Sequence, residues 1–176
     1  MNGGSSSGKT TIATSMQAEL AGTWLRLNVD TLIEAIGPHQ RMSLLPEAGG
    51  VITVTPEFTQ LEDAWMAGVA SVARNGANVL IEDGFLSGAR SQQRWTDALA
   101  GIAVFWVGVI CDEPTATRRE QARGDRSQGM ASTQRLLVHG GIRYHAIVDT
   151  TSEDPHALAA RLVITMRTTS FVCPHY

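Results

Sequence analysis

The chain has 176 residues, 43% of them hydrophobic and 18% charged, which suffices for one packed domain and is too short for two comfortable ones. Its 14 basic side chains against 17 acidic ones give a net charge of −3, so a nucleic-acid partner is not expected. No apolar run approaches the roughly 20 residues of a membrane span, and two cysteines are too few for a disulfide framework, so we expect no membrane partner and a cytoplasmic location.

Helix-like and strand-like patterns alternate along the chain, which predicts an α/β fold with a parallel central sheet. The helix after Thr55 has the clearest start, because a capping hydroxyl is followed by Pro56 in the first turn. Residues 37–50 show weak periodicity and are assigned to an insertion or substrate loop. In chain order we predict a helix at 9–20, a strand at 24–29, a helix at 31–36, a strand at 51–54, a helix at 55–72, a strand at 78–81, a helix start at 86–90, a strand at 102–111, a helix at 112–122, a strand at 144–148 and a helix at 155–166.

The segment from Gly3 to Thr10 fits the phosphate-loop pattern G-x-x-x-x-G-K-[ST] at every fixed position. Glycines let successive backbone N–H groups approach phosphate oxygens, and the following helix adds its positive end. Lys9, the only lysine, would reach the β- and γ-phosphates of ATP, and the Thr10 hydroxyl would join the Mg²⁺ shell. The alternative, a flexible Gly/Ser terminus, is disfavoured because the helical pattern begins where the motif requires it. The predicted nucleotide-binding residues are Gly3, Gly4, Ser5, Ser6, Ser7, Gly8, Lys9 and Thr10.

The phosphate loop departs from its usual context in one respect. Such a loop follows a buried strand of about five residues, yet only Met1 and Asn2 precede Gly3. That strand lies in the middle of the sheet in folds of this type, so a truncated first strand would leave neighbouring strands with unpaired backbone groups. We hypothesise that the true start lies upstream; the alternative is an inactive relic.

Four further residues are candidates for phosphotransfer chemistry. Asp83 follows the predicted strand 78–81, where a carboxylate would hold Mg²⁺, and helix capping or turn formation is the alternative. Asp30 follows another strand and could accept or orient a hydroxyl proton, or instead cap the helix at Thr31. Arg123 and Arg126 could balance charge on the transferring phosphoryl group, or could lie in an exposed, solvated loop.

Two other kinds of site are excluded by residue type and spacing. The five histidines show no zinc-ligand spacing, so a zinc site is not expected. A guanine-selecting N-K-x-D element is impossible because Lys9 is the only lysine, which removes ordinary GTPase switches.

With these residues in place, the sequence resembles the chloramphenicol phosphotransferase family of small P-loop kinases. The resemblance runs from Asn2 to about Val163. It implies a P-loop kinase-like three-layer fold, transfer of the γ-phosphoryl group of ATP to a primary hydroxyl, an acceptor-activating carboxylate at Asp30, and transition-state arginines at Arg123 and Arg126. The matching stretches are Asn-Gly-Gly-Ser-Ser-Ser-Gly-Lys-Thr at 2–10, Val-Asp-Thr-Leu-Ile-Glu-Ala at 29–35, Pro-Glu-Phe at 56–58, Trp-Val-Gly-Val at 106–109 and Ala-Arg-Gly-Asp-Arg at 122–126.

The acceptor is expected to be a small, uncharged alcohol such as chloramphenicol. Between Asp30 and Trp65 the only cation is Arg41, whereas a phosphorylated acceptor would need several arginines. Two alternatives stay open: a kinase of another small metabolite, and a nucleotide-binding protein without phosphotransfer. We expect a single kinase domain at residues 1–166 and a tail of unknown role at 167–176, and the sequence leaves the oligomeric state open.

Overall fold

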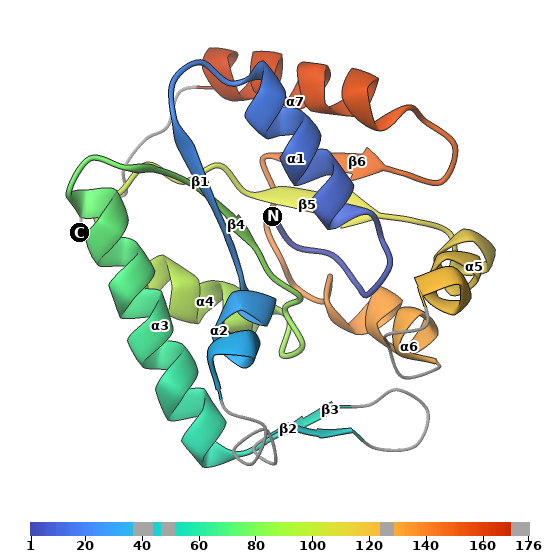
Figure 1. Ribbon diagram of the computed structural model, residues 1–176, viewed down its shortest axis with the longest axis horizontal. Coiled ribbons are helices and arrows are strands. Elements are labelled where there is room, and N and C mark those ends of the chain that lie inside the picture. Colours follow the sequence, from blue (N-terminus) through green and yellow to red (C-terminus); the bar gives the residue numbers. More distant parts are fainter. Residues whose placement is uncertain (37–43, 47–51, 124–128, 170–176) are drawn as a thin grey trace.

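A computed structural model of the chain describes residues 1–36, 44–46, 52–123 and 129–169. Helices and strands alternate over most of this length, as the sequence predicts (Figure 1). The helices are α1 (Lys9–Glu19), α2 (Val29–Ala35), α3 (Pro56–Arg74), α4 (Ala89–Ala98), α5 (Glu113–Arg123), α6 (Met130–Leu137) and α7 (Pro155–Thr168). The strands are β1 (Trp24–Asn28), β2 (Leu44–Pro46), β3 (Ile52–Val54), β4 (Asn78–Glu82), β5 (Val107–Ile110) and β6 (Ala146–Asp149).

The central sheet consists of two parallel pairs joined by Asn2. Strand β1 pairs with β4, and β5 pairs with β6. Asn2 forms parallel bridges to Asp83 and Gly108; its N–H donates to the Val107 carbonyl at 2.8 Å, and its carbonyl accepts from the Val109 N–H at 2.8 Å. The order across the sheet is therefore β1, β4, the chain at Asn2, β5 and β6. The phosphate loop leaves from the middle of the sheet.

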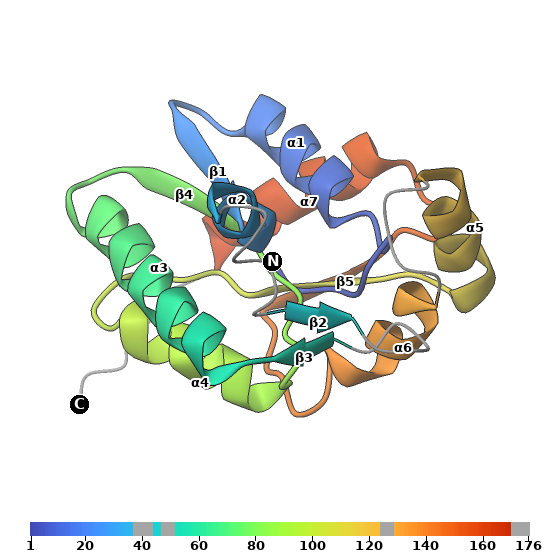
Figure 2. The same ribbon diagram turned by 60° about the horizontal axis from the view of Figure 1, so that its bottom comes forward.

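Helices cover both faces of this sheet, which makes the three layers expected of a P-loop kinase (Figures 1 and 2). Helices α1 and α7 lie side by side on one face and α3 and α4 on the other. The first face is packed with buried side chains that include Ile12 and Leu158, and the second with Met66 and Trp95. Burial of these apolar faces from water is the main stabilisation of such layers.

A cavity of about 660 Å³ lies between β4 and the residues that lead into β5. Its lining includes Met1, Val79, Ile81 and Trp106. The hypothesis of an upstream strand stays a prediction.

One predicted element differs from the structure, and two elements of the structure were not predicted. The strand expected at 102–111 is confined to β5 at 107–110, because pairing with β6 begins at Val107. Residues 102–106 line the cavity instead. The sequence analysis also missed β2, which pairs antiparallel with β3, and α6. Helix α6 has Ser132 and Thr133 at its centre, which weakens the helical pattern on which the prediction relied.

Candidate functional site

The phosphate loop has the backbone geometry that its sequence predicts. Ser6 and Gly8 have φ values of 58° and 90°, in the left-handed region that side chains disfavour. A Cβ on Gly3 would lie 2.5 Å from the carbonyl oxygen of Val109, so this position excludes any side chain. The loop then enters α1 at Lys9, and the N-terminus of this helix faces the loop.

The loop carries polar groups that no described residue satisfies. The buried hydroxyls of Ser6 and Ser7 have no hydrogen-bond partner, although burial of a lone hydroxyl costs free energy. The Nζ of Lys9 donates to the carbonyls of Gly3 at 2.7 Å and Gly4 at 2.9 Å, so it is held at the loop. A cation, buried hydroxyls and a helix N-terminus together fit an anionic ligand such as the phosphates of a nucleotide.

Thr10 and Glu82 form the second part of the site. The Thr10 hydroxyl donates to Glu82 Oε2 at 2.8 Å, and the Glu82 side chain is only 3% exposed. Glu82 Oε1 lies 3.5 Å from a guanidinium nitrogen of Arg26 and accepts no hydrogen bond from a described residue. A hydroxyl next to a buried carboxylate with a spare oxygen fits Mg²⁺, which binds few protein oxygens and completes its shell with phosphates and water. The sequence analysis missed Glu82 as a candidate.

Asp83, the predicted metal-binding carboxylate, faces α4. Its Oδ2 accepts from Trp95 Nε1 at 2.7 Å, and its Oδ1 accepts from the Gly84 N–H at 2.7 Å. Burial raises the pKa of the Asp83 carboxyl, and the Trp95 hydrogen bond opposes that shift. Successive residues of an extended segment point to opposite faces, which explains why Glu82 meets Thr10 while Asp83 meets Trp95. Asp83 also lines the candidate cavity, and its role at a metal stays a prediction.

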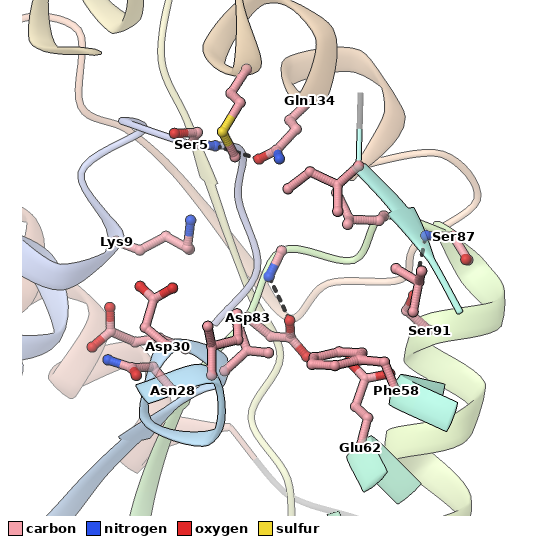
Figure 3. A pocket seen from close by; sticks show the side chains of 18 of the residues that line it. Ser5, Lys9, Asn28, Asp30, Phe58, Glu62, Asp83, Ser87, Ser91 and Gln134 are labelled. Atoms are coloured by element: carbon pink, nitrogen blue, oxygen red, sulfur yellow. Dashed lines mark hydrogen bonds between the residues drawn. The ribbon is translucent and has the colours of Figure 1, made fainter. Parts of the chain in front are cut away.

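Asp30 lies at the start of α2, on the same cavity as the phosphate loop. The helix cap is Asn28, whose side chain accepts from the Thr31 N–H at 2.8 Å, so the alternative that Asp30 caps this helix is wrong. Asp30 lines the cavity together with Lys9 and Phe58 (Figure 3). The structure therefore brings the predicted acceptor-activating carboxylate and the predicted phosphate-binding lysine to one space.

This cavity has a volume of about 580 Å³. Arg123, at the end of α5, lines it with the phosphate loop, whereas Arg126 and Arg41 lie outside the described residues. The apolar part of the lining includes Ile33 and Val54. Phe58 is 3% exposed and also lines the cavity.

A partly exposed ion-pair cluster that the sequence analysis missed forms another wall of the cavity. Arg94 on α4 donates to Asp63 Oδ1 from Nε at 3.0 Å and from Nη2 at 2.6 Å, to the Thr59 carbonyl at 3.2 Å, and to a carboxylate oxygen of Glu62. Burial raises the pKa of the Glu62 carboxyl, and the Arg94 hydrogen bond opposes that shift. Arg94 and Asp63 are 31 residues apart in the sequence, on α4 and α3, so no local sequence pattern indicates that they meet.

The sequence profile of the chloramphenicol phosphotransferase-like proteins matches residues 1–167. The chain belongs to this family. Proteins of two Mycobacterium tuberculosis strains, whose names suggest an O-phosphotransferase activity, are 29% identical to it over 92% of this chain and 78% of their own length. Family membership and the kinase fold support a small-molecule phosphotransferase. Among the described residues, no helix is long and apolar enough to cross a membrane.

Three solved structures with a similar fold are kinases of small molecules. A sugar kinase from Janibacter superposes with a TM-score of 0.70 at 16% identity, covering 94% of this chain and 91% of its own. The adenylyl-sulfate (APS) kinase of Mycobacterium tuberculosis, solved with AMPPNP and APS, gives 0.64 at 14% identity, covering 95% of each chain. A shikimate kinase from Acinetobacter baumannii gives 0.57 at 15% identity, with 96% and 93% covered. At these identities the likeness shows the P-loop kinase fold alone.

Proposed function

We propose that the chain is an ATP- and Mg²⁺-dependent O-phosphotransferase that acts on the primary hydroxyl of chloramphenicol or a similar small alcohol. The observation that carries this proposal is the shared cavity of Lys9, Thr10 and Asp30. A phosphate-binding loop and a carboxylate that can orient a hydroxyl are the two halves of phosphoryl transfer. Their meeting in one space supports transfer rather than nucleotide binding alone.

The roles of the residues follow from their positions. The loop amides and Lys9 would bind the phosphates, and Thr10 with Glu82 would hold Mg²⁺. Asp83, which lines the same cavity, would support the Mg²⁺ through water. Bound Mg²⁺ neutralises charge on the phosphate oxygens. Asp30 would orient the acceptor hydroxyl and take its proton, and Arg123 and Arg126 would offset the charge that develops during transfer. Because the transition state is loose, positioning contributes more than base strength.

Arg90 and Arg94 of α4 both line the cavity, and the surroundings of Arg94 favour an uncharged acceptor. Arg94 points its donors at two carboxylates and a carbonyl, so this guanidinium is engaged by Glu62 and Asp63 and is not the partner of an acidic acceptor. Ile33, Val54 and the ring of Phe58 add apolar surface. An alcohol with an aromatic or aliphatic body matches this combination better than a sugar phosphate does.

The test is acceptor-dependent ADP release with MgATP, using chloramphenicol and a panel of nucleosides, sugars and other alcohols. We expect Asp30→Asn to lower kcat by about a hundredfold or more while the Kd for ATP changes less than threefold. Glu34→Gln is the matched control, because Glu34 is an exposed carboxylate on the same helix. Unchanged turnover of Asp30→Asn would remove Asp30 from the mechanism.

The panel also separates the alternatives. Turnover of another alcohol in place of chloramphenicol would identify a kinase of a different metabolite. MgATP binding without acceptor-dependent ADP release from any alcohol would favour a nucleotide-binding protein without phosphotransfer. Failure to bind any nucleotide would refute the assignment of the phosphate loop.

A further inference from the structure

Helix α6 packs directly against the phosphate loop. A Cβ on Gly4 would lie 3.2 Å from the backbone nitrogen of Arg135, so the helix and the loop are in close contact. Gln134, the neighbouring residue on α6, is 7% exposed and lines the candidate cavity. Figure 3 shows its side chain beside Ser5, above Lys9 in that view. A buried polar side chain therefore reaches the loop from an element far along the chain.

The hydrogen bond to Ser5 fixes which way the amide of Gln134 faces. The Ser5 N–H donates to Gln134 Oε1 at 2.9 Å, and an N–H group cannot donate to the NH₂ group of an amide. The amide oxygen is therefore held at the loop, and Nε2 with its two donors faces away from Ser5. Among the described residues, none accepts a hydrogen bond from Nε2. Solvent reaches Nε2 from the cavity that Gln134 lines, so this donor is available to a ligand that accepts a hydrogen bond there.

The position of Ser5 in the loop indicates which part of the nucleotide Gln134 would contact. Ser5 lines the cavity together with Lys9, Thr10 and the predicted acceptor-activating carboxylate Asp30. A phosphoryl group is transferred from the terminal phosphate to the acceptor, so the phosphate that lies between loop and acceptor carboxylate is the terminal one. Gln134 lines the same cavity.

We propose that Gln134 binds an oxygen of the terminal phosphate of the nucleoside triphosphate through Nε2. This inference rests on the proposed nucleotide-dependent function. The Ser5 N–H positions the amide before the nucleotide arrives, which lowers the entropic cost of forming the contact. The residue thereby distinguishes triphosphate from diphosphate, because only the triphosphate supplies the oxygen.

The experiment compares the affinities of AMPPNP and ADP, both with Mg²⁺ and without an acceptor, by isothermal titration calorimetry. Gln134→Glu keeps an oxygen for the Ser5 N–H but replaces the donors with a negative charge. We expect it to weaken AMPPNP binding by about ten- to a hundredfold and ADP binding by less than about threefold. Gln134→Leu, which removes charge and donors together, should change the AMPPNP affinity in the same direction and less.

The matched control is Gln93→Glu, which makes the same change on an exposed glutamine of α4. It should leave both affinities at the wild-type values. An unchanged ratio of the AMPPNP and ADP affinities in Gln134→Glu would overturn the proposal, as would tighter binding of both nucleotides, which would mean that the side chain blocks the loop. Absence of nucleotide binding by the wild-type chain would refute the proposed function itself, and this inference with it.

Discussion

The buried hydrogen bond between Trp95 and Asp83 is the contact whose loss can be predicted in most detail. Trp95 and Asp83 are 3% and 7% exposed, and the indole Nε1 donates to Oδ2 at 2.7 Å. Trp95→Phe removes this donor and part of a ring that packs between α3 and α4. Loss of a hydrogen bond to a charged group costs about 1.5–3 kcal/mol, and the smaller ring adds a packing loss of about 1 kcal/mol.

We therefore expect the free energy of unfolding of Trp95→Phe to fall by about 2–4 kcal/mol, and Tm to fall by about 5–12 °C. Denaturant unfolding followed by circular dichroism measures the loss over a series of pH values. Trp106→Phe is the matched control, because it makes the same change of ring in the same apolar cluster, without a hydrogen bond to a carboxylate. We expect it to lose about 1 kcal/mol.

The loss should depend on pH in a defined direction. Burial raises the pKa of the Asp83 carboxyl above its ordinary value, so the folded state takes up a proton at a higher pH than the unfolded state does. The loss of unfolding free energy in Trp95→Phe is full above the folded-state pKa of Asp83, where the Asp83 carboxylate is charged. This loss shrinks as pH falls through that pKa. Equal losses in Trp95→Phe and Trp106→Phe at pH values above the folded-state pKa of Asp83 would refute the reasoning, as would a loss that grows toward low pH.

Three further changes test other parts of the structure. Glu82→Gln should raise the Mg²⁺ concentration at half-maximal ATP binding by about tenfold, because Thr10 then faces a neutral amide. An unchanged Mg²⁺ titration would exclude Glu82 from the metal site. Glu120→Ala should lower the free energy of unfolding, measured in urea, by about 3 kcal/mol. The reason is that the buried Glu120 carboxylate accepts from the N–H groups of Gly129 at 2.9 Å and Ala131 at 2.8 Å. A loss under about 1 kcal/mol would contradict this. Asp154→Ala removes the helix cap whose side chain accepts from the Ala157 N–H of α7 at 3.0 Å, and should lower the free energy of unfolding by about 1 kcal/mol in the same assay. No loss would show that water replaces the cap.

The sequence by itself determined the features that depend on neighbouring residues. The phosphate loop is a local motif, because the backbone angles at Ser6 and Gly8 and the helix that begins at Lys9 are set within a few positions of one another. The Thr55 cap and the start of α3 were likewise predicted correctly, since a capping hydroxyl and Pro56 act on the first turn that follows them. Alternation of such local signals was sufficient for the α/β class.

Only the tertiary structure decided which side chains share the site. Glu82 and Asp83 are adjacent in sequence, yet the pairing of β4 with β1 and the packing of α1 and α4 direct them to Thr10 and Trp95 respectively. The contact of Gln134 with Ser5 spans 129 residues and depends on how α6 packs, which no local pattern encodes. The physical reason is that local signals act through backbone geometry over a few residues, whereas site composition depends on burial and strand register across the whole sheet.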